Sequence, residues 1–321
     1  MTGRDLVNLI LFTRVIFAPR LHSVSRLESV VIVKGASDIT FEGLEIRYAR
    51  GPGVKIDDSK NIVLKSCSVS NHGMMGVNIT GGSGCGIETS EVAGNGDAGV
   101  VLMGGDRITL APGNHFVDNS TVHHNHRWIM MFSPDVLLAG VGQSLTNSEI
   151  YGSPHFAVFY QGNDHTMSGC HVHDAARQCS DCAAFYSGRS WTYRGSSILN
   201  TKFSSMTSIF PKAHGMPAAV YLDDQLSSVK VSGCMFEQIG GRVMLLGGGR
   251  HNEFVGNLLV QSEPTQVIGM DARGGLGTRC IEKGPNTLTI GLESVPYNTS
   301  TAWKKYPDLA NILSDEPCTP K

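Results

Sequence analysis

The chain has 321 residues, of which 41% are hydrophobic and only 17% charged, and it contains 38 glycines. A formal net charge of −2 provides no overall basic field that would hold nucleic acid. No run of about 18 apolar residues predicts a membrane span. We therefore expect neither nucleic acid nor a membrane as a partner, and we expect a fold with many tight turns.

The first 28 residues form an N-terminal segment that lacks the pattern found further along. Its apolar run is interrupted by Asn8 and Arg14, and Asp5 lies where a signal peptide carries positive charge. The segment is a poor signal peptide for these reasons. We interpret residues 1–28 as a capping segment or a truncated end.

A short motif recurs along residues 29–284. It reads apolar, polar, small or Asn, then Cys, Ser or Thr, any residue, and an apolar anchor, as in LKSCSV and MSGCHV. The anchors are Ile46, Val69, Val92, Val122, Ile150, Val172, Phe203, Phe236 and Leu259. Four of the eight intervals between anchors are 22 or 23 residues, and the other four are 28–33. The chain therefore repeats one unit, which carries insertions in some copies.

The repeat indicates a solenoid of short parallel strands. Apolar residues alternate within each unit, which is typical of strands and not of helical repeats. Parallel strands need crossover connections, and these are overwhelmingly right-handed. We predict an all-β, right-handed parallel β-helix of about nine to ten rungs over residues 29–284. A short irregular or helical tail at 285–321 is expected to cover an open end of the coil, where strand edges would otherwise be exposed.

Two positions of the motif predict the corners of the coil. Three residues before each anchor stands Gly, Asn, Ser or Thr, residue types suited to a tight corner. The next position holds Cys67, Cys170, Cys234 or a hydroxyl residue, so we expect these three cysteines to be buried free thiols. Cys179 and Cys182 form a lone CxxC outside the pattern, which favours a disulfide over a zinc site if the protein is secreted.

The units also contain a second short buried strand, which mostly begins with a small residue, as at residues 53–56, 76–79, 99–102, 157–160, 183–186, 219–222 and 243–246. Charged residues gather after this strand in the middle units. The clusters are Asp106 with Arg107, Asp164 with His165, Arg189 with Trp191, Asp223 with Asp224, and Arg250 with His251. Residues at one phase of a solenoid stack on one face, about 4.8 Å apart per rung. We therefore expect these clusters to line one continuous face, where they bind a substrate. Trp128 and Trp191 lie in insertions and can stack on sugar rings.

Two histidine-rich stretches are candidates for metal sites. His123, His124 and His126 form one, and His171 and His173 form the other. No acidic or cysteine partner stands at a diagnostic spacing from either. We predict that neither binds a metal and that the protein needs no cofactor.

The runs GVVLMGGDRITL, DCAAFYSGRSWTYRG and AVYLDDQLSS lie within roughly residues 29–317. Together they resemble a family of secreted right-handed β-helix proteins that includes plant-polysaccharide glycoside hydrolases of the α-fucosidase and xylanase kind. The resemblance implies an extracellular protein that binds a polysaccharide or oligosaccharide. It also implies that Asp181 and one of Asp223 and Asp224 are the catalytic carboxylates. Glycosidic cleavage needs one carboxyl group as acid and a second as base or nucleophile.

Three functions remain open from the sequence. The first is a monomeric glycoside hydrolase, for which the segment 178–182 must fold back over the groove, because Asp181 precedes its strand whereas Asp223 follows its own. The second is a polysaccharide lyase or epimerase, with calcium held by acids such as Asp223 and Asp224 and with Arg250 or His165 available as the basic group. The third is a carbohydrate-binding or structural solenoid without catalysis.

Overall fold

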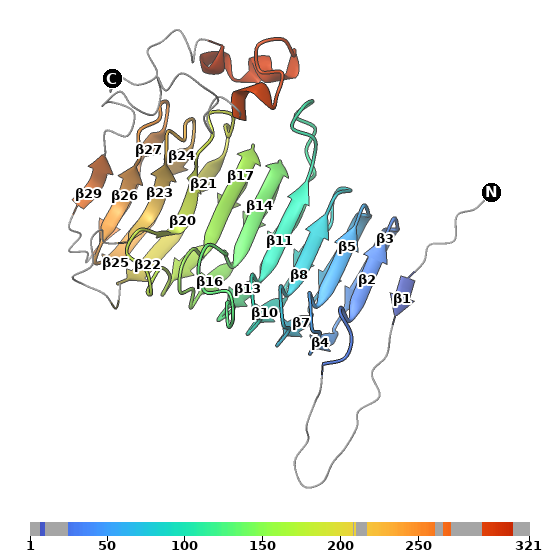
Figure 1. Ribbon diagram of the computed structural model, residues 1–321. Helices are drawn as coiled ribbons and strands as arrows, with labels where there is room; N and C mark the ends of the chain where they lie inside the picture. The colour runs from blue at the N-terminus through green and yellow to red at the C-terminus, as the bar shows by residue number, and fades with distance from the viewer. Residues whose placement is uncertain are drawn as a thin grey trace.

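The structure is a computed structural model that describes residues 7–9, 25–207, 209, 217–260, 266–270 and 291–310, and the statements below concern these residues. Three sheets form a right-handed parallel β-helix (Figure 1), which confirms the predicted fold class. All described pairs are parallel except β1 with β2, which are antiparallel. In this part of the chain no helix is long and apolar enough to cross a membrane.

Each rung contributes one strand to each sheet. Sheet A contains β1 (Val7–Leu9), β2 (Val31–Lys34), β5 (Val54–Asp57), β8 (Val77–Thr80), β11 (Val100–Gly104), β14 (Val136–Val141), β17 (Val158–Asn163), β20 (Ala183–Gly188), β23 (Ala218–Asp223), β26 (Arg242–Leu246) and β29 (Gln266–Met270). Sheet B contains β3 (Ser37–Glu42), β6 (Lys60–Lys65), β9 (Gly86–Glu88), β12 (Phe116–Asp118), β15 (Ser144–Thr146), β18 (Thr166–Ser168), β21 (Ser197–Leu199), β24 (Lys230–Ser232) and β27 (Glu253–Val255). Sheet C contains β4 (Glu45–Arg47), β7 (Ser68–Ser70), β10 (Glu91–Ala93), β13 (Thr121–His123), β16 (Glu149–Tyr151), β19 (His171–His173), β22 (Lys202–Met206), β25 (Met235–Ile239) and β28 (Leu258–Val260).

The nine predicted anchors all lie in sheet C and pair with one another in chain order, from Ile46 with Val69 to Phe236 with Leu259. The middle residue of a three-residue strand points inward, so Val92 and Val122 are fully buried in the core. Burying one such side chain contributes roughly 1.5–3 kcal/mol. The longer intervals between anchors are loops inserted into otherwise regular rungs.

One strand of sheet A escaped the sequence pattern. The predicted series of second strands passes from residues 99–102 to 157–160, whereas the structure places β14 between them. Most predicted members of the series begin with a small residue before the apolar ones. β14 follows Asp135 instead, so the pattern did not detect it, although its inward residues Val136 and Leu138 are fully buried.

The corners have the backbone that the motif predicts. All nine residues three places before an anchor have positive φ; they are Gly43, Ser66, Thr89, Asn119, Asn147, Gly169, Asn200, Gly233 and Gly256. At the next position, the backbone N–H of Cys67 donates to Oγ of Ser90 at 2.9 Å. The N–H of Ser90 donates to Ser120 Oγ at 3.0 Å, and that of Ser120 donates to Ser148 Oγ at 3.0 Å. This ladder satisfies amide groups that would otherwise be buried without a partner.

Residues 291–310, the described part of the tail, lie on the flank of the coil and not over one of its ends, contrary to the expectation for this part. Residues 291–310 include the 3₁₀ helices η1 (Ala302–Lys305) and η2 (Pro307–Leu309), which lie above the ends of the central strands of sheet A (Figure 1). Trp303 and Leu309 are fully buried there in one cluster with Trp191. This part of the tail lies on the flank because it covers the apolar side chain of Trp191 there.

The free thiols provide a direct test of the coil interior. Cys67, Cys85, Cys170 and Cys234 are unbridged and buried, as predicted for three of them. Burial raises the pKa of Cys170 to about 11 and also raises the pKa of Cys85 and Cys234. We therefore expect none of these thiols to react with iodoacetamide in the native protein at neutral pH, because thiolate is the reactive form.

Pulse alkylation followed by peptide mass spectrometry measures this reactivity residue by residue. The same protein unfolded in urea is the control, and all four thiols are expected to react there. Rapid native labelling of Cys170 or Cys234 would contradict the interior position of the ladder.

Candidate functional site

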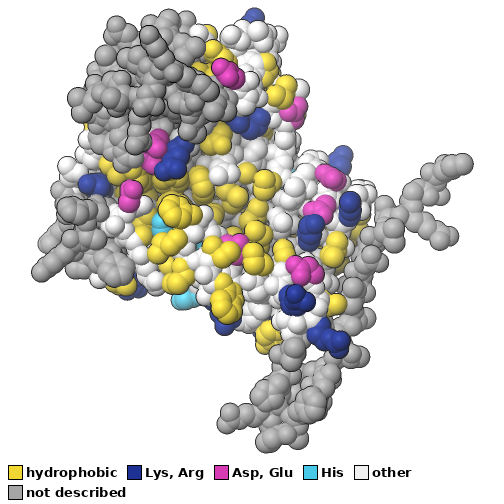
Figure 2. All heavy atoms as spheres, in the orientation of Figure 1, with side chains coloured by type: hydrophobic (Ala, Val, Ile, Leu, Met, Phe, Trp, Pro, Cys, Tyr) yellow, Lys and Arg dark blue, Asp and Glu magenta, His cyan; other side chains and the backbone are white. Residues whose placement is uncertain are grey.

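The outer face of sheet A carries a row of apolar and aromatic side chains. Leu137, Phe159, Tyr186, Tyr221 and Leu245 pair in register across five strands, while the residues before them point into the core. Tyr186, Tyr221 and Leu245 are buried in a second apolar cluster outside the coil, and the partly buried Phe159 packs against it. Figure 2 shows hydrophobic side chains gathered over the middle of this face. The row forms an apolar floor.

Asp223 lies at one end of this floor, as the last residue of β23. The hydroxyl of Tyr186 donates a hydrogen bond to Asp223 Oδ2 at 2.8 Å, and the backbone N–H of Asp224 donates to Oδ1 at 2.8 Å. Asp223 is only 4% exposed although it stands on the outer side of the sheet. Burial, and then the charge of Asp223, raises the pKa of Tyr186, so the phenol remains a proton donor.

Two glycines make room for this carboxylate. A Cβ at Gly188 would lie 2.8 Å from Asp223 Cβ, and a Cβ at Gly247 would lie 3.0 Å from Asp223 Oδ1. Both glycines lie on rungs next to Asp223, since Gly188 pairs with Asp223 and Gly247 follows β26. Larger residues there would displace the acid.

Asp224 and Arg189 complete the cluster. Arg189 Nε lies 3.2 Å from Asp224 Oδ2, with the arginine side chain 66% exposed and that of Asp224 20% exposed. Both residues have positive φ, which turns the chain at the ends of β20 and β23. Coulombic interaction with Tyr186 and, after the opposing effect of burial, with Asp224 raises the pKa of Arg189. The carboxylates of Asp223 and Asp224, the phenol of Tyr186 and the guanidinium of Arg189 thus lie together at the ends of the neighbouring strands β20 and β23.

The predicted clusters all follow strands of sheet A, namely β11, β17, β20, β23 and β26, and so share the corner between sheets A and B. Not all of them are accessible. His165 is fully buried: its Nδ1 accepts the backbone N–H of Gln143 at 3.2 Å. Burial lowers its pKa to about 4. The prediction that His165 binds substrate is therefore wrong. Its neutral imidazole is buried at a corner of the coil, where it accepts a backbone hydrogen bond from the neighbouring rung.

Trp191 is also wrongly predicted as a sugar-binding residue. It is 1% exposed beneath the tail, where it packs with Leu292, Val295 and Trp303. Its indole Nε1–H donates to Gln225 Oε1 at 3.4 Å. Because its indole ring is almost completely buried, Trp191 stabilises the flank of the coil and offers no face to a sugar.

Other charged residues hold the tail and the loops in place. Arg107 donates from Nε to Asn163 Oδ1 at 3.0 Å and from Nη2 to Thr192 Oγ1 at 2.6 Å. Asp164 pairs with Lys305 at 2.8 Å. His251 Nδ1 lies 3.6 Å from Asp308 Oδ2. These three residues, predicted to bind substrate, are instead engaged in contacts within the protein.

Asp106 and Arg250 also take part in hydrogen bonds within the coil. The carboxylate of Asp106 accepts the backbone N–H of Ile108 and the hydroxyl of Thr109, each at 2.8 Å, and these bonds lower its pKa. Asp106 is therefore a turn-stabilising residue. The backbone N–H of Arg250 donates to Ser227 Oγ at 3.0 Å, and its side chain is half-buried.

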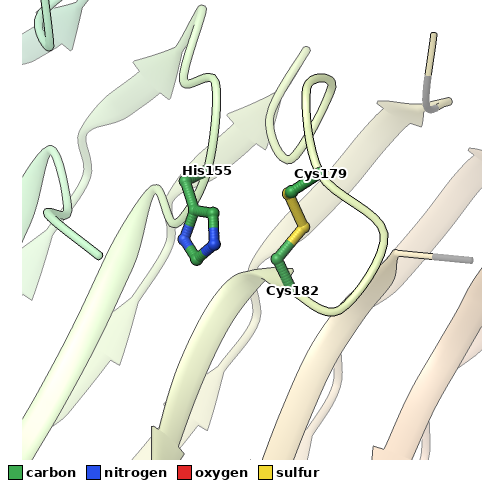
Figure 3. A group of neighbouring side chains, drawn as sticks. All are labelled: His155, Cys179 and Cys182. Atoms are coloured by element: carbon green, nitrogen blue, oxygen red, sulfur yellow. A yellow bond between two sulfur atoms is a disulfide. The ribbon is translucent and has the colours of Figure 1, made fainter. Parts of the chain in front are cut away.

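Asp181 lies in a different place from Asp223. It is exposed in the loop closed by the Cys179–Cys182 disulfide (Figure 3), just before β20. In the register, Ala183 pairs with Ala218 and Gly188 pairs with Asp223. The disulfide loop packs on the outer apolar cluster, but the two acids flank opposite ends of neighbouring strands, five residues or roughly 17 Å of strand apart.

The sequence reasoning missed Tyr186 and an apolar loop. Alternation was the available signal for Tyr186, because Phe185 points inward and the next side chain must point outward. The loop at residues 128–132, before β14, exposes Trp128 by 77% and Phe132 by 80%. Trp128, predicted to stack on sugars, is thus accessible at the opposite end of the strands from Asp223.

The comparisons with known proteins agree with the fold. A family profile described as right handed beta helix region matches residues 29–125. No curated protein matches the chain. A solved structure with a similar fold is the A-module of the Azotobacter vinelandii mannuronan C-5 epimerase AlgE4, with a TM-score of 0.51 and 11% identity over 71% of this chain and 62% of that one.

Two further similar structures have lower scores. One is a protein titled glycoside hydrolase, with a TM-score of 0.46 and 14% identity over 66% of this chain and 38% of that one. The other is the Agl-KA catalytic domain, with a TM-score of 0.38 and 12% identity over 76% and 46%. The chain spans less than two thirds of all three structures, and identities this low show the fold alone.

Removing Trp303 tests the packing of the tail on the coil. Its side chain is fully buried, and its Nε1–H donates to the backbone oxygen of Arg107 at 3.0 Å. We expect Trp303→Ala to lower the free energy of unfolding by about 3–5 kcal/mol, as for other buried tryptophans. Loss of the cover should also shift the fluorescence of Trp191 to longer wavelength.

Urea unfolding and emission spectra measure both effects. Trp128→Ala is the matched control, because Trp128 is 77% exposed and its removal should leave stability nearly unchanged. Equal stability of the two variants would contradict the packing described.

Proposed function

We propose that this protein is a carbohydrate-active enzyme that binds a polysaccharide along the outer face of sheet A and hydrolyses it with Asp223 and Asp224. One observation carries the proposal: a buried carboxylate stands on the outer side of a sheet, next to a second carboxylate that has its own cation. Burying a charge is costly unless it is well paired. The core of the coil does not need this group, and such costly placements are typical of functional sites.

The two acids have different surroundings, which suits them to different roles. The guanidinium of Arg189 balances the charge of Asp224, so Asp224 is suited to act as the ionised base or nucleophile. Asp223 is largely removed from water, and the hydroxyl of Tyr186 holds its carboxyl group in place. We assign proton transfer to the leaving oxygen to Asp223, which accepts hydrogen bonds on both oxygens as a carboxylate and therefore has to take up a proton from water before this step. This division follows the requirement of glycosidic cleavage for one acid and one ionised partner.

The rest of the face supplies binding surface for a neutral sugar chain. The ring of Phe159 is half-buried on β17 and can meet a sugar ring, while the neighbouring ring of Tyr186, with centroids 5.2 Å apart, is buried and supports it. Trp128 and Phe132 extend the apolar surface at the far end of the strands. Aromatic faces stack on sugar rings, so a cell-wall-type polysaccharide suits this floor.

The same proposal includes an extracellular location, a monomeric protein and a hydrolysis reaction that needs no cofactor. The Cys179–Cys182 disulfide supports the location, because disulfides persist in oxidising compartments.

A polysaccharide lyase or epimerase is the second candidate. The contact between Tyr186 and Asp223 favours it, since a phenol next to a carboxylate can relay a proton. Arg189 could then neutralise the carboxylate of a uronate substrate. Calcium, if this activity needs it, would be held by Asp223 and Asp224. Uronate-bearing glycans tested with and without chelator separate these reactions from hydrolysis, because a lyase forms an unsaturated product that absorbs ultraviolet light and an epimerase inverts a uronate without cleaving the chain.

Single substitutions test the assigned carboxylates on a substrate that the parent protein cleaves. Asp223→Asn and Asp224→Asn are each expected to lower kcat by roughly 10²–10⁴-fold, the usual contribution of a positioned acid or base. Asp181→Asn is the control, because Asp181 lies at the other end of the strands, and it should retain turnover. Circular dichroism verifies that each variant keeps its fold.

Two outcomes would overturn the assignment. The first is loss of turnover in Asp181→Asn with full activity in both other variants. The second is the absence of cleavage across a panel of neutral and uronate glycans, with binding retained, which would support a carbohydrate-binding solenoid.

A further inference from the structure

Sheet C carries a cluster of metal-ligating side chains on its outer face, away from the acids of sheet A. Glu149 lies on β16, and His171 and His173 lie on the neighbouring strand β19. Glu149 pairs with His171 in the register, and Val172 between the two histidines is fully buried. Both imidazoles and the carboxylate therefore point outward on the same side of the sheet.

The three donor atoms converge. Glu149 Oε1 lies 3.1 Å from His173 Nε2 and 3.8 Å from His171 Nδ1. All three atoms lie within 4.8 Å of one another. Metal bonds of about 2.0–2.2 Å that meet at a tetrahedral angle put ligand atoms roughly 3.3–3.5 Å apart. The observed distances to Glu149 bracket that value, so one ion can contact all three groups with little movement.

The surrounding hydrogen bonds orient both imidazoles for this role. Each ring nitrogen of His173 faces a carboxylate, with Nδ1 2.9 Å from Asp174 Oδ2 and Nε2 3.1 Å from Glu149 Oε1. With the hydrogen on Nδ1 and donated to Asp174, the lone pair of Nε2 points toward Glu149 and can bind an ion there. His171 Nε2 lies 2.8 Å from Ser204 Oγ, which leaves Nδ1 on the side of Glu149.

A carboxylate behind a ligating histidine is the usual support of such sites. Tyr151 adds a further restraint, since its ring stacks on His173 with centroids 4.8 Å apart. Lys202, whose charge acts on His171, is itself paired with Glu237 at 2.5 Å.

We propose that Glu149, His171 and His173 bind a divalent transition-metal ion of the zinc class. Two imidazoles and one carboxylate suit zinc, cobalt or nickel, whereas calcium and magnesium prefer oxygen ligands alone. The three side chains are 46%, 37% and 18% exposed, so a fourth position is open to water or to an outside ligand. The ion would join two adjacent rungs, and its binding would stabilise the coil.

Calorimetric titration with zinc chloride tests the site in the full-length protein, prepared without a histidine tag and without reductant, so that the Cys179–Cys182 disulfide stays closed. We expect one saturable site in the parent and its loss in His173→Gln and Glu149→Gln. Asp174→Asn should weaken binding by about 10–100-fold, as loss of a supporting carboxylate does elsewhere. Zinc should raise the Tm of the parent and leave that of His173→Gln unchanged.

The matched control is His123→Gln, which removes a histidine from the same face that pairs with Glu91 instead. It should bind zinc as the parent does. Equal affinity in the parent and in both ligand variants would overturn the proposal, and so would an equal loss in His123→Gln. Calcium chloride, as a second probe, should give no saturable binding that depends on His173. Asp223→Asn should bind zinc normally, so the result is independent of the function proposed for sheet A.

Discussion

Backbone amide groups buried at the corners of the coil constrain the whole structure. At each corner a side chain of one rung accepts the N–H of the rung before it. Nδ1 of His72 accepts the N–H of Ala49 at 2.9 Å, and Nδ1 of His115 accepts that of Cys85 at 3.1 Å. At the corner between sheets B and C, the hydroxyl of Ser120 accepts the N–H of Ser90. An unpaired buried amide costs about as much as a lost hydrogen bond, so each corner position is restricted to residues that can accept one or stay small.

This restriction explains why the fold could be predicted from the sequence. It repeats once per rung, and so it appears as a periodic choice of Ser, Thr, Cys, Asn or His beside an apolar anchor. The same rule explains the error on His165, which was counted with the charged residues of the groove. His165 occupies the same corner position as His115 and Gln143 in the two preceding rungs. Aligning the rungs of the sequence with one another would have placed it in the interior. Trp191 offered no such signal, because its cover comes from residues 291–310, about one hundred residues away and outside the repeat.

The candidate site was only partly predictable for a related reason. The adjacent acids Asp223 and Asp224 stand out as charges after an apolar strand, and the structure joins Asp224 to Arg189. Tyr186 carries no charge and sits within an apolar strand, so only its outward phase distinguishes it. The glycines that admit Asp223 contribute through the absence of a side chain, which no search for functional groups detects. The position of Asp181 depends on how the strand register aligns Ala183 with Ala218, and local sequence does not determine that alignment.

The histidines of sheet C show how a solenoid changes the meaning of sequence spacing. Searches for metal sites look for ligands a few residues apart, as on one helix or one loop, and by that criterion His171 and His173 have no acidic partner. In a coil, the residue directly above another in the sheet lies one rung away in sequence, and here Glu149 pairs with His171 across 22 residues. Ligands on one strand of this fold are therefore two residues apart in sequence, and ligands on neighbouring strands are separated by a whole rung of 22 residues or more. Because insertions vary that period, the register of the strands is needed to recognise such a site.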